Sequence, residues 1–145
     1  MARAKLLPVM QACEAVVGTI LVGGSAVPVS PANAPDCPKP YIVVTSVSSP
    51  RYTGPMSDTE ADSADRIQFS CVALSAVQAD WLRDKVREVL TTAALDAAFV
   101  TLSANRRVLM CILDIPRGVQ RDDRGLPEPI FNSIDQYMIE TTPTA

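Results

Sequence analysis

Residues 107–115 read RVLMCILDI, and Pro116 follows them. Their β-branched and apolar content predicts a β-strand that ends at the proline. Side chains alternate between the two faces of a strand, so one predicted face holds Leu109, Cys111, Leu113 and Ile115 and the other holds Val108, Met110 and Ile112. An antiparallel strand with one solvated face normally carries polar residues on that side. We therefore expect both faces of this strand to be buried.

The elements around this strand predict a single α+β domain over residues 1–145. Apolar residues at three- and four-residue spacing indicate helices at 3–17 and 75–90. The second helix begins with a capping box formed by Ser75 and Gln78. Strands are predicted at 41–47, 66–74, 107–115 and 130–141. The order α-β-β-α-β-β favours an antiparallel four-stranded sheet with two helices packed on one face.

The second face of this sheet needs a cover that the two helices do not provide. Burying a Val, Leu or Ile side chain contributes about 1.5–3 kcal/mol, so leaving several exposed on one strand forfeits several kcal/mol. Two covers are possible: residues 19–40 and 91–105, whose structure the sequence does not define, or a neighbouring subunit. The second alternative makes the chain a homo-oligomer. It makes Val108, Met110 and Ile112 candidate subunit-interface residues.

Two charged connections are candidates for contact with other proteins. Residues 48–65 form a predicted long loop, and loops beyond about 12–15 residues are commonly functional or disordered. Alternatively, residues 48–65 are only a flexible, solvated connection with no contact function. Residues 118–129 form a second predicted loop. The candidate partner-contact residues are Arg51, Tyr52, Met56, Asp58, Glu60, Asp62, Arg117, Arg121, Asp122, Asp123 and Arg124.

The composition argues against several classes of function. The chain has no histidine, which removes the commonest general base and metal ligand. Its net charge is −3 with dispersed basic residues, so we expect no direct binding to nucleic acid or to an anionic membrane surface. We expect no enzymatic activity, no metal and no cofactor.

The four cysteines are Cys13, Cys37, Cys71 and Cys111, and no two of them form a C-x-x-C pair. Buried or half-buried free thiols in a reducing compartment are the simplest interpretation. A small cysteine-dependent enzyme is an alternative. Its thiol would need activation by a helix N-terminus or by a basic side chain.

The first 34 residues partly imitate a secretory signal peptide, with Arg3 and Lys5 ahead of the apolar run 15–22. Glu14 interrupts that pattern, and cleavage after Ala34 would leave an odd number of cysteines. We expect a protein that is not secreted, with a secreted binding module as the alternative. No stretch approaches the ~20 apolar residues of a membrane-spanning helix.

The order of these segments resembles one family of virus structural proteins. An N-terminal helix leads to Gly23-Gly24 and a proline-rich connection, followed by PYIVV at 40–44, RIQFSC at 66–71 and ADWL at 79–82. The chain closes with a hairpin from RDDRGL at 121–126 to IDQY at 134–137. This pattern, over about residues 5–142, is similar to that of the tail terminator (tail completion, or tail-to-head joining) proteins of long-tailed bacteriophages.

The resemblance implies a homohexameric ring that caps the tail tube, ends its polymerisation and joins the tail to the head connector. It implies tail tube protein and head-tail connector proteins as partners, and no active site. The protein would be made in the cytoplasm of the host bacterium and reside in the virion, at the tail-neck junction. Residues 23–40 and 91–105 are longer than in the family pattern. Another neck component, such as a head-completion or connector protein, is the nearest alternative.

Overall fold

The structure is a computed structural model, which describes residues 2–30, 40–47, 51–53, 62–102, 106–122 and 130–143. The helices are α1 (Ala2–Val17), α2 (Ala76–Val89) and α3 (Thr92–Val100). The strands are β1 (Leu21–Val22), β2 (Ser25–Ala26), β3 (Val29–Ser30), β4 (Tyr41–Ser46), β5 (Arg51–Thr53), β6 (Asp62–Ala73), β7 (Arg106–Asp122) and β8 (Ile130–Pro143).

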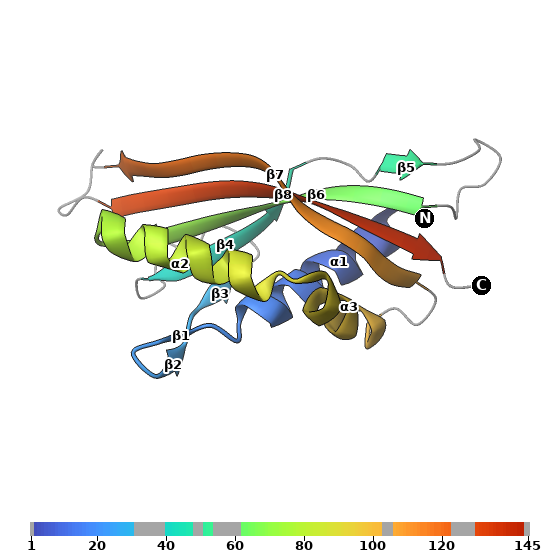
Figure 1. Ribbon diagram of the computed structural model, residues 1–145, viewed down its shortest axis with the longest axis horizontal. Coiled ribbons are helices and arrows are strands. Elements are labelled where there is room, and N and C mark those ends of the chain that lie inside the picture. The colour runs from blue at the N-terminus through green and yellow to red at the C-terminus, as the bar shows by residue number, and fades with distance from the viewer. Residues whose placement is uncertain are drawn as a thin grey trace.

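The main sheet confirms the predicted α+β class and is wider than expected. Its order is β3-β4-β6-β8-β7, and β5 pairs with the beginning of β6. The predicted four strands are the antiparallel neighbours β4, β6, β8 and β7, whereas β3 runs parallel to β4. A separate hairpin, β1–β2, turns through Gly23 and Gly24, whose φ angles of 60° and 85° favour glycine. All three helices lie on the same side of the main sheet (Figure 1).

The helix ends follow from local sequence. The Ser75 side chain accepts a hydrogen bond from the backbone N–H of Gln78 at 3.1 Å and caps α2. Thr91 accepts from the N–H of Ala94 at 3.2 Å and caps α3 in the same way. Helix α3 was not predicted, because TAALDAAFV is apolar on every side and has no helical periodicity.

Two predicted boundaries were wrong. Pro116 does not end β7, which continues to Asp122, so Arg117, Arg121 and Asp122 lie in a strand and not in a loop. In an edge strand, every second backbone N–H points away from the sheet and has no partner strand. Proline, which has no N–H, is tolerated at such a position because no hydrogen bond between strands is lost. The predicted loop 48–65 is also partly strand, since β5 spans Arg51–Thr53 and β6 begins at Asp62.

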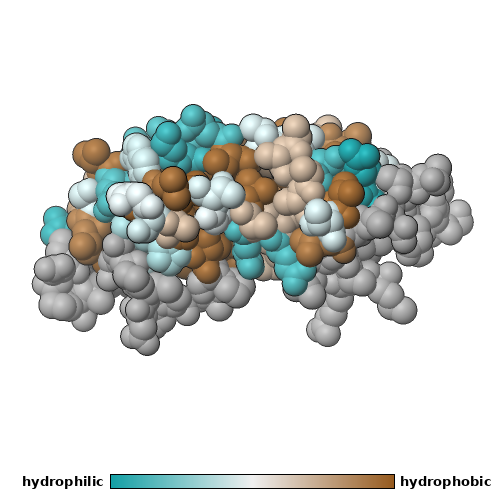
Figure 2. Space-filling view, turned by 90° about the horizontal axis from the view of Figure 1, so that it is seen from below, coloured by the Kyte–Doolittle hydropathy of each residue, from teal (hydrophilic) through white to brown (hydrophobic). Residues whose placement is uncertain are grey.

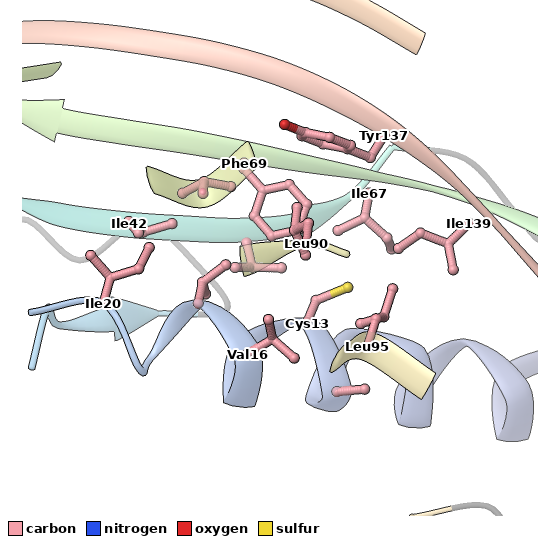
Figure 3. Packing of buried hydrophobic residues seen from close by; sticks show 14 of the residues in the cluster. Cys13, Val16, Ile20, Ile42, Ile67, Phe69, Leu90, Leu95, Tyr137 and Ile139 are labelled. Carbon is pink, nitrogen blue, oxygen red and sulfur yellow. The ribbon is translucent and has the colours of Figure 1, made fainter. Parts of the chain in front are cut away.

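The core lies between the sheet and the helices (Figure 3). Ile67, Phe69 and Cys71 of β6 alternate toward it, as predicted, and each is no more than 1% exposed. The Phe69 and Tyr137 rings meet edge-to-face, with centroids 5.4 Å apart and an interplanar angle of 88°. Cys13 and Val16 of α1 and Leu95 of α3 close the core from the other side (Figure 3).

Asp96 fastens α3 to β7. Its carboxylate accepts hydrogen bonds from the backbone N–H of Val108 at 2.8 Å and from Arg107 Nε at 2.9 Å. The hydrogen bond from Arg107 is the main cause that holds the pKa of Asp96 below its ordinary value. The contact therefore stabilises the folded state more when the carboxylate is ionised than when it is neutral.

We expect acid to weaken this attachment. Because the folded-state pKa of Asp96 is lowered, its contribution is present above the ordinary aspartate pKa of about 3.9 and is lost as the pH falls through the folded value. An Asp96→Ala variant should unfold more easily at neutral pH and lose less additional stability on acidification. Denaturant titrations at several pH values measure both effects, with Asp84→Ala, at an exposed position of α2, as the control. An acid dependence identical to that of the wild type would contradict this role.

Candidate assembly surface

A β-bulge near the start of β7 decides which side chains face outward. The ladder pairs Val108 with Thr141 and Met110 with Glu140, so Leu109 is an extra residue without a cross-strand partner. An extra residue shifts the alternation by one position. Val108 consequently lies on the core side and is 8% exposed, so its predicted place beside Met110 and Ile112 was wrong.

After the bulge, β7 is apolar on both sides, as predicted. Cys111 and Leu113 pack against the core. Leu109, Met110 and Ile112 are exposed by 49%, 38% and 44%, and we call these three residues the β7 patch. A second register shift, between Leu113 and Ile115, moves Ile115 away from its predicted face.

The remainder of the outer face, the sheet side opposite the helices, is mostly polar or covered among the described residues, with Val47 directly after β4, 43% exposed, as the exception. Gln136 Nε2 donates to Gln68 Oε1 at 3.3 Å across β8 and β6. Arg66 forms an ion pair with Asp114 at 2.8 Å. At the β4 end, Tyr41 and Val72 are 6% and 5% exposed. The exposed apolar part of this face is therefore concentrated on β7.

The described parts of residues 19–40 and 91–105 do not cover the β7 patch. Helix α3 lies on the opposite side of the sheet, where Leu95 and Phe99 are no more than 1% exposed within the core (Figure 1). The β1–β2 hairpin projects from the helix side as well (Figure 1). The alternative in which these segments shelter the outer face is therefore wrong for the helix and the hairpin.

The open edge of β7 is poorly suited to the addition of another strand. Asp96 already accepts the outward N–H of Val108. Register shifts after Val108, Leu113 and Pro116 interrupt the regular row of backbone groups, and bulges and prolines are known devices that protect sheet edges. A partner is therefore better accommodated on the face of β7 than along its edge.

The two groups of predicted contact residues lie at opposite ends of the sheet. Arg51 and Tyr52 pair with Ala64 and Ser63 at the start of β6, which in turn lies against Thr141 near the end of β8. Arg121 and Asp122 pair with the start of β8. Arg117 and Arg121 are exposed. The structure thus separates the two groups. Met56, Asp58, Glu60, Asp123 and Arg124 lie outside the described residues.

A second exposed apolar group, on the helix side, was not predicted. Leu74, Val77 and Trp81 are 49%, 82% and 39% exposed at the beginning of α2. Lys85 Nζ lies 5.7 Å from the centre of the Trp81 ring. Their three- and four-residue spacing was visible in the sequence, off the buried stripe that includes Leu82 and Val86. Figure 2 shows hydrophobic patches interspersed with hydrophilic residues on this side.

The helix side also carries an open groove of about 370 Å³ where the three helices meet. Small and apolar side chains form most of its wall, and Glu88 is its only charged lining residue among those described. The lining residues are Ala15, Val16, Thr19, Glu88, Val89, Thr91, Ala94 and Ala98. This composition suits an apolar side chain better than a polar ligand.

The three described cysteines are free and lack the environment of a reactive thiol. Burial raises the pKa of Cys71 to about 12 and that of Cys111 to about 11. Burial also raises the pKa of Cys13 well above its ordinary value, and the nearby Cys111 adds to this effect. A nucleophilic thiol requires the opposite shift. These environments argue against Cys13, Cys71 or Cys111 as the nucleophile of a cysteine-dependent enzyme.

Thiol labelling tests this conclusion. We expect Cys13 and Cys71 to react with a maleimide or disulfide reagent only after unfolding, and Cys111 to react far more slowly than a free cysteine at neutral pH. Mass spectrometry of tryptic peptides assigns the label to each residue. Rapid labelling of any of the three in the folded protein would show that its thiolate is accessible.

Within the described residues, no group of His, Cys, Asp and Glu side chains has the arrangement of a metal site. None of the described helices is long and apolar enough to cross a membrane.

No protein-family model matches this sequence, and no curated protein sequence matches it significantly. Among solved structures, the chain is similar to one described as "Virion of native gene transfer agent (GTA) particle". The two are 15% identical, with a TM-score of 0.49, and the match covers 97% of this chain and 94% of that one. At this score and identity, the likeness assigns neither a family nor a function.

Proposed function

We propose that this chain is a structural, non-catalytic subunit of a virion, and specifically a tail terminator. In this function it forms a ring with copies of itself, caps the tail tube and joins it to the head connector. The proposal combines the segment pattern of the sequence with an exposed surface suited to self-association.

The β7 patch is the observation that carries the proposal. Burying apolar surface contributes roughly 25 cal/mol per Å², so three large side chains left 38–49% exposed represent stabilisation that the monomer does not obtain. The chain has a complete core without them, since Cys111 and Leu113 of the same strand already pack inward. A second copy packed on the outer face would recover that energy.

Within a cyclic ring, each subunit contacts its two neighbours through two unlike surfaces, and the repeated interface closes on itself.

A tail terminator also needs different contacts above and below the plane of the ring. The two predicted contact groups, around Arg51 and Arg121, lie at opposite ends of the sheet. This separation suits a subunit that contacts the tail tube at one end and a connector protein at the other.

Deleting the gene for this chain, in a bacterial strain that produces the virion, tests the tail terminator function. We expect tails of uncontrolled length and heads that remain unjoined, because nothing would end tube polymerisation. Electron microscopy of the lysate measures tail length and joining. Re-supplying the wild-type protein should restore both, whereas a variant with aspartate at Met110 and Ile112 should not.

The same experiment distinguishes a tail terminator from the nearest alternative, another neck component. A head-completion or connector protein would leave tails of normal length beside heads that leak or fail to join. That result, or co-purification with filled heads and not with tail tubes, would contradict the terminator function and favour another neck component.

A further inference from the structure

Asp135 is an enclosed carboxylate on the helix side of the sheet. Its cross-strand neighbours are Phe69 on β6 and Pro116 on β7, and it is 2% exposed. Helix α2 contacts β6, β7 and β8 and covers this part of the sheet (Figure 1). The side chain therefore lies between three strands and a helix.

Neither carboxylate oxygen of Asp135 makes a hydrogen bond of normal geometry. The nearest cation is Arg87 on α2, whose Nη2 lies 3.9 Å from Asp135 Oδ2, which is too long for a hydrogen bond. The hydroxyls of Ser133 and Tyr137, two residues away on either side of the same strand, are also buried without hydrogen bonds of normal geometry. Most buried polar groups are paired, so this cluster requires an explanation.

The groups that face Asp135 act in opposite directions on its pKa. Burial has the largest effect and raises it, Arg83 and Arg87 of α2 and the backbone N–H of Arg117 lower it, and Asp84 of α2 raises it slightly. The outcome is a pKa above the ordinary value for aspartate. Cys71 and Tyr137 also face the carboxyl, and burial raises the pKa of each to about 12, so both stay neutral.

We propose that Asp135 is a proton-controlled clamp for α2, which packs more firmly on the sheet when this carboxyl takes up a proton. When Asp135 is ionised, its negative charge lies beneath α2 without enough hydrogen bonds or water to replace its solvation. The neutral carboxyl is less costly to enclose, so α2 closes over it. The helix that responds also carries the exposed Val77 and Trp81 and begins just after the exposed Leu74, which links the presentation of that apolar group to pH.

The direction of the effect follows from the raised pKa. The folded state binds the proton more tightly than the unfolded chain does, so stability falls as the pH rises from the ordinary aspartate pKa, about 3.9, through the folded-state value. Above that value the cost of the buried charge is constant. Asp135 thus acts in the opposite sense to Asp96, whose contribution is lost in acid.

Hydrogen exchange of α2 measures the clamp directly, and Trp81, the only tryptophan of the chain, provides a fluorescent reporter on the same helix. After correction for intrinsic exchange, we expect the protection of α2 amides relative to those of β6 to rise as the pH falls from about 7 to about 4. In Asp135→Asn, protection should be high throughout and independent of pH.

Two further variants keep the test decisive. Asp114→Asn removes a carboxylate on the outer face and should leave the α2 response unchanged. Arg87→Gln removes a cation from a half-exposed position, so it should move the midpoint of the response to higher pH even if Asp135→Asn fails to fold. An α2 response that is identical in wild type and Asp135→Asn, or a midpoint that Arg87→Gln leaves unmoved, would overturn the proposal.

Discussion

Replacing Phe69 by alanine is expected to lower the free energy of unfolding by about 3–5 kcal/mol, the usual cost of removing a fully buried aromatic ring. Phe69 is 1% exposed and lies at the centre of the core, where its ring meets the edge of Tyr137 at a centroid distance of 5.4 Å. The variant would lose both the transfer free energy of the ring and the aromatic contact, and it would leave a cavity beneath the helices.

A loss of this size is a large fraction of the roughly 5–15 kcal/mol that stabilises a typical domain. Urea titration followed by circular dichroism measures it. Val77→Ala is the matched control, because Val77 is 82% exposed and its replacement should change stability by no more than about 0.5 kcal/mol. A Phe69→Ala variant as stable as the control would contradict the packing of Phe69 in the core.

Introducing aspartate at both Met110 and Ile112 is expected to abolish self-association while leaving the fold intact. Both side chains are exposed in the single chain, so the monomer can solvate the new carboxylates. In an interface the same charges would be buried without partners, which costs several kcal/mol. Because each 1.4 kcal/mol changes affinity tenfold, we expect the dissociation constant to rise by more than about 100-fold.

Sedimentation velocity of the double variant measures the change, and circular dichroism confirms that it folds. Leu21→Asp is the control: Leu21 is 61% exposed on the β1–β2 hairpin, on the helix side, and its replacement should leave association unchanged. Equal weakening by both substitutions would indicate a nonspecific effect of charge. Undiminished association of the double variant would exclude the β7 patch as the interface.

The parts of the fold that sequence alone predicted are those determined by local patterns. The alternation of Ile67, Phe69 and Cys71 identified β6 and its buried face, and Ser75 identified the start of α2 through its cap. Each of these features depends on neighbours along the chain. The strands β4, β6, β7 and β8 were likewise predicted from local composition, whereas β3 and β5 were not.

The features that sequence did not predict depend on contacts between distant segments. The extra residue Leu109 is defined by the pairing of β7 with β8, and it reverses the face on which Val108 lies. Pro116 is tolerated because β7 is an edge strand, a property of the whole sheet. Helix α3 is stabilised by Leu95 and Phe99 in the core and by Asp96 on β7, and its own sequence has no helical periodicity.

The sequence therefore predicted an apolar strand at 107–115, which lies within β7, but assigned its side chains to the two faces only in part. Met110 and Ile112 are exposed, as an interface requires, whereas Val108 belongs to the core. Leu109 was assigned to the opposite face, and only the bulge explains its exposure.

The mass of the purified wild-type protein in solution, measured by sedimentation equilibrium over a range of concentrations, tests self-association through β7 most directly. We expect one dominant species at a fixed whole-number multiple of the 15.5 kDa subunit mass. A folded 15.5 kDa monomer at every concentration would contradict it, because the β7 patch would then remain in water without a second copy to cover it.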